Sequence, residues 1–110
     1  NDTLFLKNEY KIIRVNISDI RYVEGMGEYL KIHFISDRKP LMILSSMKKM
    51  EKHLANNSFM RIHRSWIINL IDINEVNKNR ILMNDGMYVP IGDMYREGFL
   101  NYVDSKFLDK

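Results

Sequence analysis

The stretch FMRIHRSWIIN, residues 59–69, contains the pattern on which the fold prediction rests. Runs rich in Ile, Phe and Trp, which are favoured in β-strands, lie on both sides of the Arg64-Ser65 pair. A polar pair between two such runs is typical of a turn. The stretch therefore predicts two strands, over 59–63 and 66–70, whose junction carries basic side chains.

Similar short β-type runs, separated by clusters of Asn, Asp, Gly or Ser, dominate the rest of the chain. The Asp85-Gly86 pair lies between two of them and supplies the positive φ angles of a tight hairpin. The run at 29–35 alternates as a half-buried strand does. One face of this strand carries Leu30, Ile32 and Phe34, and the other face carries Tyr29, Lys31 and His33. The sequence thus predicts a mainly β domain with strands over 3–7, 10–15, 20–24, 29–35, 40–44, 59–63, 66–70, 80–84 and 87–91.

Two segments follow a helical period instead. In residues 45–54 the apolar side chains recur at helical spacing behind a serine cap, Ser45 or Ser46, so a short amphipathic helix is predicted. Its outward face carries Lys48, Lys49 and Lys52. From Asp93 onward, Tyr95 and Phe99 begin a second helical pattern, and Asp93 is expected to cap that helix.

Composition places the chain among ordinary globular domains. Its 110 residues, 45% hydrophobic and 28% charged, are enough to bury a core without a disulfide or a metal. The absence of cysteine excludes a disulfide scaffold and fits a reducing cytoplasm. No run approaches the length of a membrane span, and the first residue is not Met. We therefore expect one cytoplasmic domain, residues 1–110, cut from a longer protein.

The chemistry-bearing residues form no recognisable catalytic or metal-binding pattern. His33, His53 and His63 lack the close-paired spacing of metal ligands, and no glycine-rich phosphate loop or nucleophile motif occurs. The carboxylates are scattered singly, mostly beside Lys or Arg, as in solvated surface pairs. We expect neither an enzyme nor a bound cofactor or metal.

Basic residues gather at the expected strand ends and turns, and the formal net charge is +3. Arginine suits a bidentate contact with guanine in the major groove, while Ser, Lys and Tyr commonly position phosphates. A β domain with such loop tips could therefore bind DNA. Simple solvation of these side chains is the alternative that composition leaves open.

The order and wording of these motifs resemble the LytTR family, the DNA-binding domain that follows a receiver domain in many bacterial response regulators. ISDIRYVEGMGEYLKIHF (17–34) is similar to the family's strand, loop and strand, and FMRIHRSWIIN to its most specific motif, F.R.HRSYIVN. The 73–76 strand, the 80–90 hairpin and VPIG (89–92) follow in order. The resemblance covers nearly the whole chain and implies elongated antiparallel β-sheets with two short helices, whose loops enter successive major grooves.

The resemblance also implies DNA contacts in the central motif. Arg64 occupies the family's base-reading position and Ser65 a phosphate-contacting one. Arg61 is a further candidate for a phosphate, and His63 is either a contact or a hydrogen-bonded structural residue. The residues that follow, 66–69, are expected to pack in the core and to hold backbone groups of the next turn.

Two further contact regions flank that motif. Lys31 matches a residue for a base edge or a phosphate, and Tyr29 either binds a phosphate or packs on the sheet. After VPI, many members carry Arg, whereas this chain has Gly-Asp-Met at 92–94, and an Asp repels phosphate. Tyr95 and Arg96 are therefore expected to supply only backbone contacts there.

As a whole, the resemblance implies sequence-specific binding of double-stranded promoter DNA by the output domain of a two-component transcriptional regulator. An upstream receiver domain and a dimer on direct repeats are the implied partners. One alternative is a protein-interaction module whose β edges take a partner chain. Another is an RNA-binding domain with exposed Tyr22, Tyr29 and Tyr88.

Overall fold

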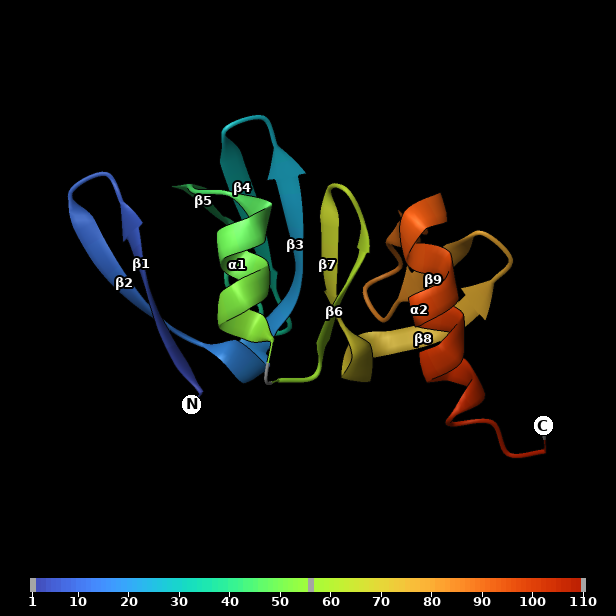
Figure 1. The fold of residues 1–110 in the computed structure, drawn as a ribbon. Coiled ribbons are helices and arrows are strands. Elements are labelled where there is room, and N and C mark those ends of the chain that lie inside the picture. Colours follow the sequence, from blue (N-terminus) through green and yellow to red (C-terminus); the bar gives the residue numbers. More distant parts are fainter. Residues whose placement is uncertain (1, 56, 110) are drawn as a thin grey trace.

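Within the residues that the computed structural model describes, three antiparallel sheets and two helices follow one another along a body that measures 50 × 25 × 25 Å (Figure 1). These residues are 2–55 and 57–109. The mainly β prediction is confirmed. The strands are β1 (Thr3–Asn8), β2 (Lys11–Asn16), β3 (Ile20–Met26), β4 (Tyr29–Phe34), β5 (Leu41–Leu44), β6 (Phe59–His63), β7 (Trp66–Asn69), β8 (Ile73–Asn77), β9 (Arg80–Met83) and β10 (Tyr88–Pro90). The helices are α1 (Met47–Leu54) and α2 (Asp93–Asp104), and short 3-10 turns span Ile17–Asp19 and Leu70–Asp72.

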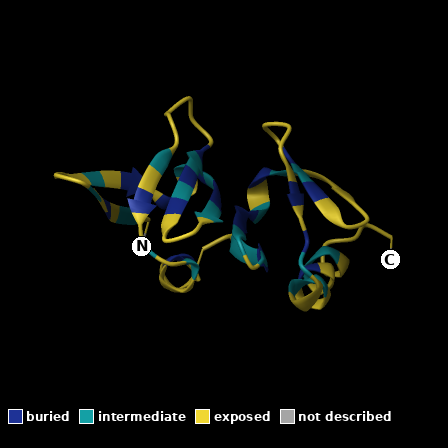
Figure 2. Ribbon diagram, turned by 90° about the horizontal axis from the view of Figure 1, so that it is seen from above, coloured by how far each residue is buried: buried dark blue, intermediate teal, exposed yellow. Residues whose placement is uncertain are grey.

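The stretch FMRIHRSWIIN forms β6 and β7 and sits in the middle of the molecule. Strands β1 and β2 form a hairpin, the central sheet has the order β5-β4-β3-β7-β6, and the third sheet has the order β10-β9-β8. Both helices lie on the same side of the sheets, as the view from above in Figure 2 shows. Helix α1 is on the side of the first hairpin, and α2 is beside the third sheet (Figure 1).

The central strands separate two hydrophobic cores. Val23 and Ile67 belong to the core that α1 covers, whereas their neighbours Tyr22 and Ile68 belong to the core that α2 covers. Because successive side chains of a strand point to opposite faces, strands buried on both faces read as continuous apolar runs. This arrangement explains the unbroken apolar run at 66–68 and confirms its place in the core.

The two helix starts differ from each other. Ser46 caps α1 as expected, with its hydroxyl oxygen accepting from the Lys49 amide at 3.2 Å. The expectation that Asp93 caps α2 is wrong, because Gly92 is the N-cap and Asp93 is the first helical residue. The Gly92 amide donates to the Ile62 carbonyl at 2.8 Å, which holds the chain against β6 one residue earlier than the sequence indicated.

The hairpin at Asp85-Gly86 is present, but its turn is wider than expected. Gly86 has a φ of +90°, while Asp85 keeps a negative φ and uses its side chain. One carboxylate oxygen accepts from the Tyr22 hydroxyl at 2.8 Å and the other from the Met87 amide at 3.0 Å. Tyr22 is therefore not an exposed stacking residue, since it is only 2% exposed.

Candidate nucleic-acid interface

Three loops lie along one edge of the molecule, the upper edge in Figure 1: the β3–β4 turn, the β6–β7 turn and the start of α2. Backbone hydrogen bonds join them. The Gly25 amide, near the end of β3, donates to the Ser65 carbonyl at 2.8 Å, and the Gly92 amide donates to the Ile62 carbonyl at 2.8 Å. The folded chain thus brings the three contact regions expected from the sequence onto one edge.

The β6–β7 turn presents Arg64. A register shift at the end of β6 pairs His63 with Trp66, so that Arg64 and Ser65 form the connection. The Ser65 amide donates to Nδ1 of His63 at 3.0 Å, which gives His63 a structural hydrogen bond within the turn. Arg64 is exposed, and its side chain makes no hydrogen bond or ion pair within residues 2–55 and 57–109. Its guanidinium is therefore available to a partner.

Arg61 lies in β6, just before this turn, and its side chain is held by other groups of the protein. Its side chain is 17% exposed, and its Nη1 is 3.2 Å from Oε1 of Glu51 on α1. It also donates to two backbone carbonyls of the turn, those of His63 at 3.3 Å and Arg64 at 2.6 Å. The expected phosphate contact of Arg61 stays a prediction, and no sequence pattern indicated the pairing with Glu51.

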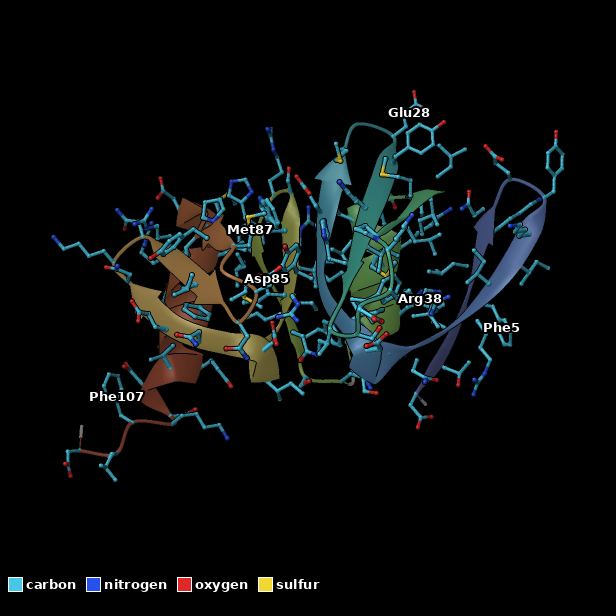
Figure 3. All side chains as sticks on the ribbon, turned by 180° about the vertical axis from the view of Figure 1, so that it is seen from behind. Phe5, Glu28, Arg38, Asp85, Met87 and Phe107 are labelled. Atoms are coloured by element: carbon cyan, nitrogen blue, oxygen red, sulfur yellow. The ribbon has the colours of Figure 1, made fainter. Side chains whose placement is uncertain are left out.

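The β3–β4 turn is exposed from Met26 to Tyr29. Gly27 has a φ of +64°, a backbone conformation that L side chains rarely adopt, and it allows the tight connection. Tyr29 follows it and is 48% exposed, opposite Met26 across the hairpin. Lys31 is half-buried on the same face of β4 and is paired in register with Glu24. Glu28 marks the projecting tip of this turn in Figure 3.

The start of α2 adjoins the central turn. The Tyr95 ring centroid lies 5.7 Å from Cζ of Arg61, within the range of a cation–π contact. Nη2 of Arg96 lies 3.4 Å from both the Ile91 carbonyl and Oδ1 of Asp93. Met94 extends into solvent with 94% of its surface exposed. Phosphate contacts by Tyr95 and Arg96 stay predictions.

A polar cluster around the buried pair of Arg21 and Asp72, which no sequence pattern predicted, ties the central sheet to the third sheet. Nη1 of Arg21 on β3 is 2.6 Å from Oδ2 of Asp72, and Nδ2 of Asn84 donates to the other oxygen of Asp72 at 3.2 Å. Nε of Arg21 also lies 4.0 Å from Oδ2 of Asp85, the carboxylate that accepts from Tyr22. In Figure 3 Asp85 lies toward the middle of the molecule. No local sequence motif indicates this cluster, because Arg21 is far in the sequence from Asp72, Asn84 and Asp85.

Two titratable groups beside this cluster have shifted pKa values. Burial, reinforced by the Asp85 hydrogen bond, raises the pKa of the Tyr22 hydroxyl. Burial lowers the pKa of His33, and the Glu24 carboxylate at 3.4 Å partly opposes that shift.

Within the described residues no group of three His, Cys, Asp or Glu side chains could hold a metal ion. No described helix is long and apolar enough to cross a membrane.

Comparison with known proteins identifies the family. The pattern of the LytTr DNA-binding domain matches residues 10–104. The chain belongs to this family. The resemblance found in the sequence is thereby confirmed, and this LytTr domain is a DNA-binding domain.

Its relatives extend the comparison. The chain is 32% identical over 97 residues to the sensory transduction protein LytT of Bacillus anthracis, covering 84% of this chain and 39% of that protein. It is 34% identical over 97 residues to the protein of the same name from Bacillus cereus, with the same coverage of 84% and 39%. This LytTr domain therefore spans about two-fifths of the length of these relatives, as the 39% coverage shows.

A solved structure has the same fold. The LytTr DNA-binding domain of a putative methyl-accepting/DNA response regulator from Bacillus cereus superposes with a TM-score of 0.77 at 23% identity. The match covers 94% of this chain and 97% of the other. The predicted arrangement of elongated antiparallel sheets with two helices is confirmed by this likeness.

Proposed function

We propose that this LytTr domain binds specific sequences of double-stranded DNA through the edge that carries the three loops. The observation that carries the proposal is Arg64, an exposed arginine without a side-chain partner among the described residues, on a turn whose backbone is hydrogen-bonded on both sides. A guanidinium so presented matches O6 and N7 of guanine in the major groove. Such contacts specify sequence, while contacts to phosphates mainly position the protein.

The rest of the edge suits the positioning role. Ser65 and Tyr29 offer hydroxyls, and Lys31 and Arg96 offer positive charge beside the reading turn. The long axis of 50 Å exceeds the roughly 34 Å of one DNA helical turn, which supports contacts in more than one groove. The domain would act as a binding module without catalysis of its own.

The longer relatives suggest the setting. Because the chain covers 39% of proteins named for sensory transduction, we propose that it is the output domain of a two-component transcriptional regulator in the cytoplasm. An upstream receiver domain would control it, and phosphorylation of that receiver would favour a dimer on direct repeats. In this setting the domain would bind promoter half-sites.

Selection of bound sequences from random duplex DNA, followed by replacement of Arg64 with Ala, tests the proposal. The Arg64→Ala variant is expected to lose roughly 1–3 kcal/mol of binding free energy on the selected site and to relax one base preference. Affinity is measured by fluorescence anisotropy at fixed salt, because phosphate contacts make it salt-dependent. Lys106→Ala is the control, since Lys106 follows the last residue of α2, Asp104, in the C-terminal segment, which Figure 1 shows at the opposite edge.

Two results would contradict the proposal. Random duplexes from which no preferred sequence emerges would exclude specific binding by this domain. Binding of single-stranded RNA as tightly as the selected duplex would favour the RNA alternative. That alternative has already lost one of its stacking candidates, because Tyr22 is buried.

A further inference from the structure

We propose that Arg61 is a positioning residue, which fixes the backbone of the β6–β7 turn and thereby the base preference of Arg64. Its role is to orient its neighbour, not to neutralise a phosphate. The inference rests on the proposed function, since it concerns how the same edge selects a sequence. Arg61 is held by contacts to α1, to the turn and to α2.

All three nitrogens of the Arg61 guanidinium face an acceptor of the protein. Nε donates to the His63 carbonyl at 3.3 Å, and Nη2 donates to the Arg64 carbonyl at 2.6 Å. Nη1 donates to Oε1 of Glu51 at 3.2 Å. A phosphate that bound this group would have to compete with these acceptors for its hydrogen atoms.

The two carbonyls are placed on either side of the reading residue. The His63 carbonyl belongs to the peptide plane that precedes Arg64, and the Arg64 carbonyl to the plane that follows it. Because peptide planes are rigid, holding both planes restricts the φ and ψ angles of Arg64 and the direction of its Cα–Cβ bond. One guanidinium thus sets the direction in which the Arg64 side chain leaves the turn.

The guanidinium is itself anchored from two more sides. Glu51 fixes one end to α1, and the Tyr95 ring centroid lies 5.7 Å from Cζ of Arg61 on the side of α2. The Arg61 side chain is only 17% exposed, whereas Glu51 is 48% exposed. Binding sites of high specificity need such support, because an error of roughly half an ångström in placement weakens recognition.

Lysine separates positioning from phosphate binding. It keeps the positive charge, but a single ammonium cannot span three acceptors in the geometry of a planar guanidinium. If Arg61 bound a phosphate, Arg61→Lys would change the affinities for all sites by a similar factor and keep the base preference. If Arg61 positions the turn, the same variant loses base preference while its charge is unchanged.

The experiment measures base preference and salt dependence separately. The base preference is the ratio of two affinities, that for the selected site and that for the same site altered at the base read by Arg64. For Arg61→Lys this ratio is expected to fall roughly five- to tenfold, within the range of one bidentate contact. For Arg61→Gln, the ratio falls similarly while the log–log salt slope stays within about 0.5 of the parent value. Arg14→Lys, on the exposed face of the first hairpin, is the control and is expected to leave the ratio unchanged.

A measurement without DNA keeps the two proposals distinguishable. Backbone ¹⁵N relaxation of Arg64 and Ser65 is expected to give order parameters near the rigid value of about 0.85 in the parent and lower values in Arg61→Lys. Thermal unfolding checks that Arg61→Lys is folded. If Arg61→Lys does not fold, Glu51→Gln, which keeps Arg61, takes its place in the affinity and the relaxation measurements. An unchanged base ratio in a folded variant, or a salt slope that falls by about 0.9 in Arg61→Gln, would overturn the positioning role. A parent domain without base preference would overturn the proposed function, whatever the relaxation shows.

Discussion

Arg21 and Arg61 each join distant parts of this LytTr domain, but they do so in different surroundings. The Arg21 junction, formed with Asp72 and Asp85, lies between the central and third sheets, and its closest pair has side chains only 12% and 6% exposed. The Arg61 junction, formed with Glu51 and the β6–β7 turn, lies at the edge, where Glu51 is 48% exposed. We therefore expect Arg21 to stabilise the fold and Arg61 to set the conformation of the β6–β7 turn.

Physical chemistry assigns unequal energies to the two junctions. An exposed ion pair contributes little to stability, because water and salt screen it. Breaking a buried pair by removing one partner is costly, because the remaining charge is left without compensation. The Arg21 junction should therefore control the free energy of unfolding, and the Arg61 junction mainly the conformation of the turn.

Replacing Asp72 with Ala tests the more buried of the two junctions. The variant leaves the buried Arg21 guanidinium without its 2.6 Å partner and removes the acceptor of Asn84, so a loss of about 3–5 kcal/mol in the free energy of unfolding is expected. Urea denaturation followed by circular dichroism measures it. Glu51→Ala is the matched control and should cost less than about 1 kcal/mol. Equal losses in the two variants would refute the contrast between the junctions.

Tyr22→Phe tests a single hydrogen bond of the Arg21 junction. It removes the hydroxyl that donates to Asp85 at 2.8 Å but keeps the buried ring, so a cost of about 1 kcal/mol is expected. The cost stays modest because Asp85 is 33% exposed and keeps the Met87 amide as a donor. Tyr88→Phe is the control, since the Tyr88 hydroxyl has no hydrogen bond within the described part of the chain. The same urea series compares the two, and a larger loss in Tyr88→Phe would contradict the assignment.

Much of the fold followed from local patterns in the sequence. Alternation predicted the faces of β4, and Leu30, Ile32 and Phe34 are indeed buried. The serine cap predicted the start of α1. Local patterns failed where tertiary contacts decide: Asp93 has the chemistry of a cap, but the hydrogen bond from Gly92 to β6 sets where α2 begins.

The sequence predicted the turn that presents Arg64, but not the contacts within that turn. Basic residues at a strand junction indicated the β6–β7 turn, and the family motif singled out Arg64. The different surroundings of Arg61 and Arg64 could not be read from the sequence, because the partners of Arg61 lie on another element or in the backbone of the turn. Only the fold brings Glu51 of α1 and two turn carbonyls to the guanidinium of Arg61.

The pH dependence of stability tests the surroundings of Tyr22, near the Arg21 junction, and the expected change is small. The His33 ring lies 4.5 Å from the Tyr22 ring, and burial lowers the pKa of His33 below its ordinary value of 6.5. As the pH falls through 6.5, His33 takes up a proton in the unfolded chain before it does so in the folded chain. The contribution of His33 to the free energy of unfolding is therefore lost between pH 6.5 and the lowered pKa of the folded chain. The nearby charges are those of Glu24, Lys31 and Asp85, of which the two carboxylates oppose the shift.

His33→Gln should remove this part of the acid sensitivity. Between about pH 7.5 and about pH 5, a range that spans the ordinary pKa of histidine, it is expected to lose less stability than the parent in urea denaturation. His53→Gln is the control, because His53 is exposed on α1, and its pH dependence should follow the parent. If His33→Gln also follows the parent, protonation beside Tyr22 does not weaken the fold, and acid destabilises the domain through other groups.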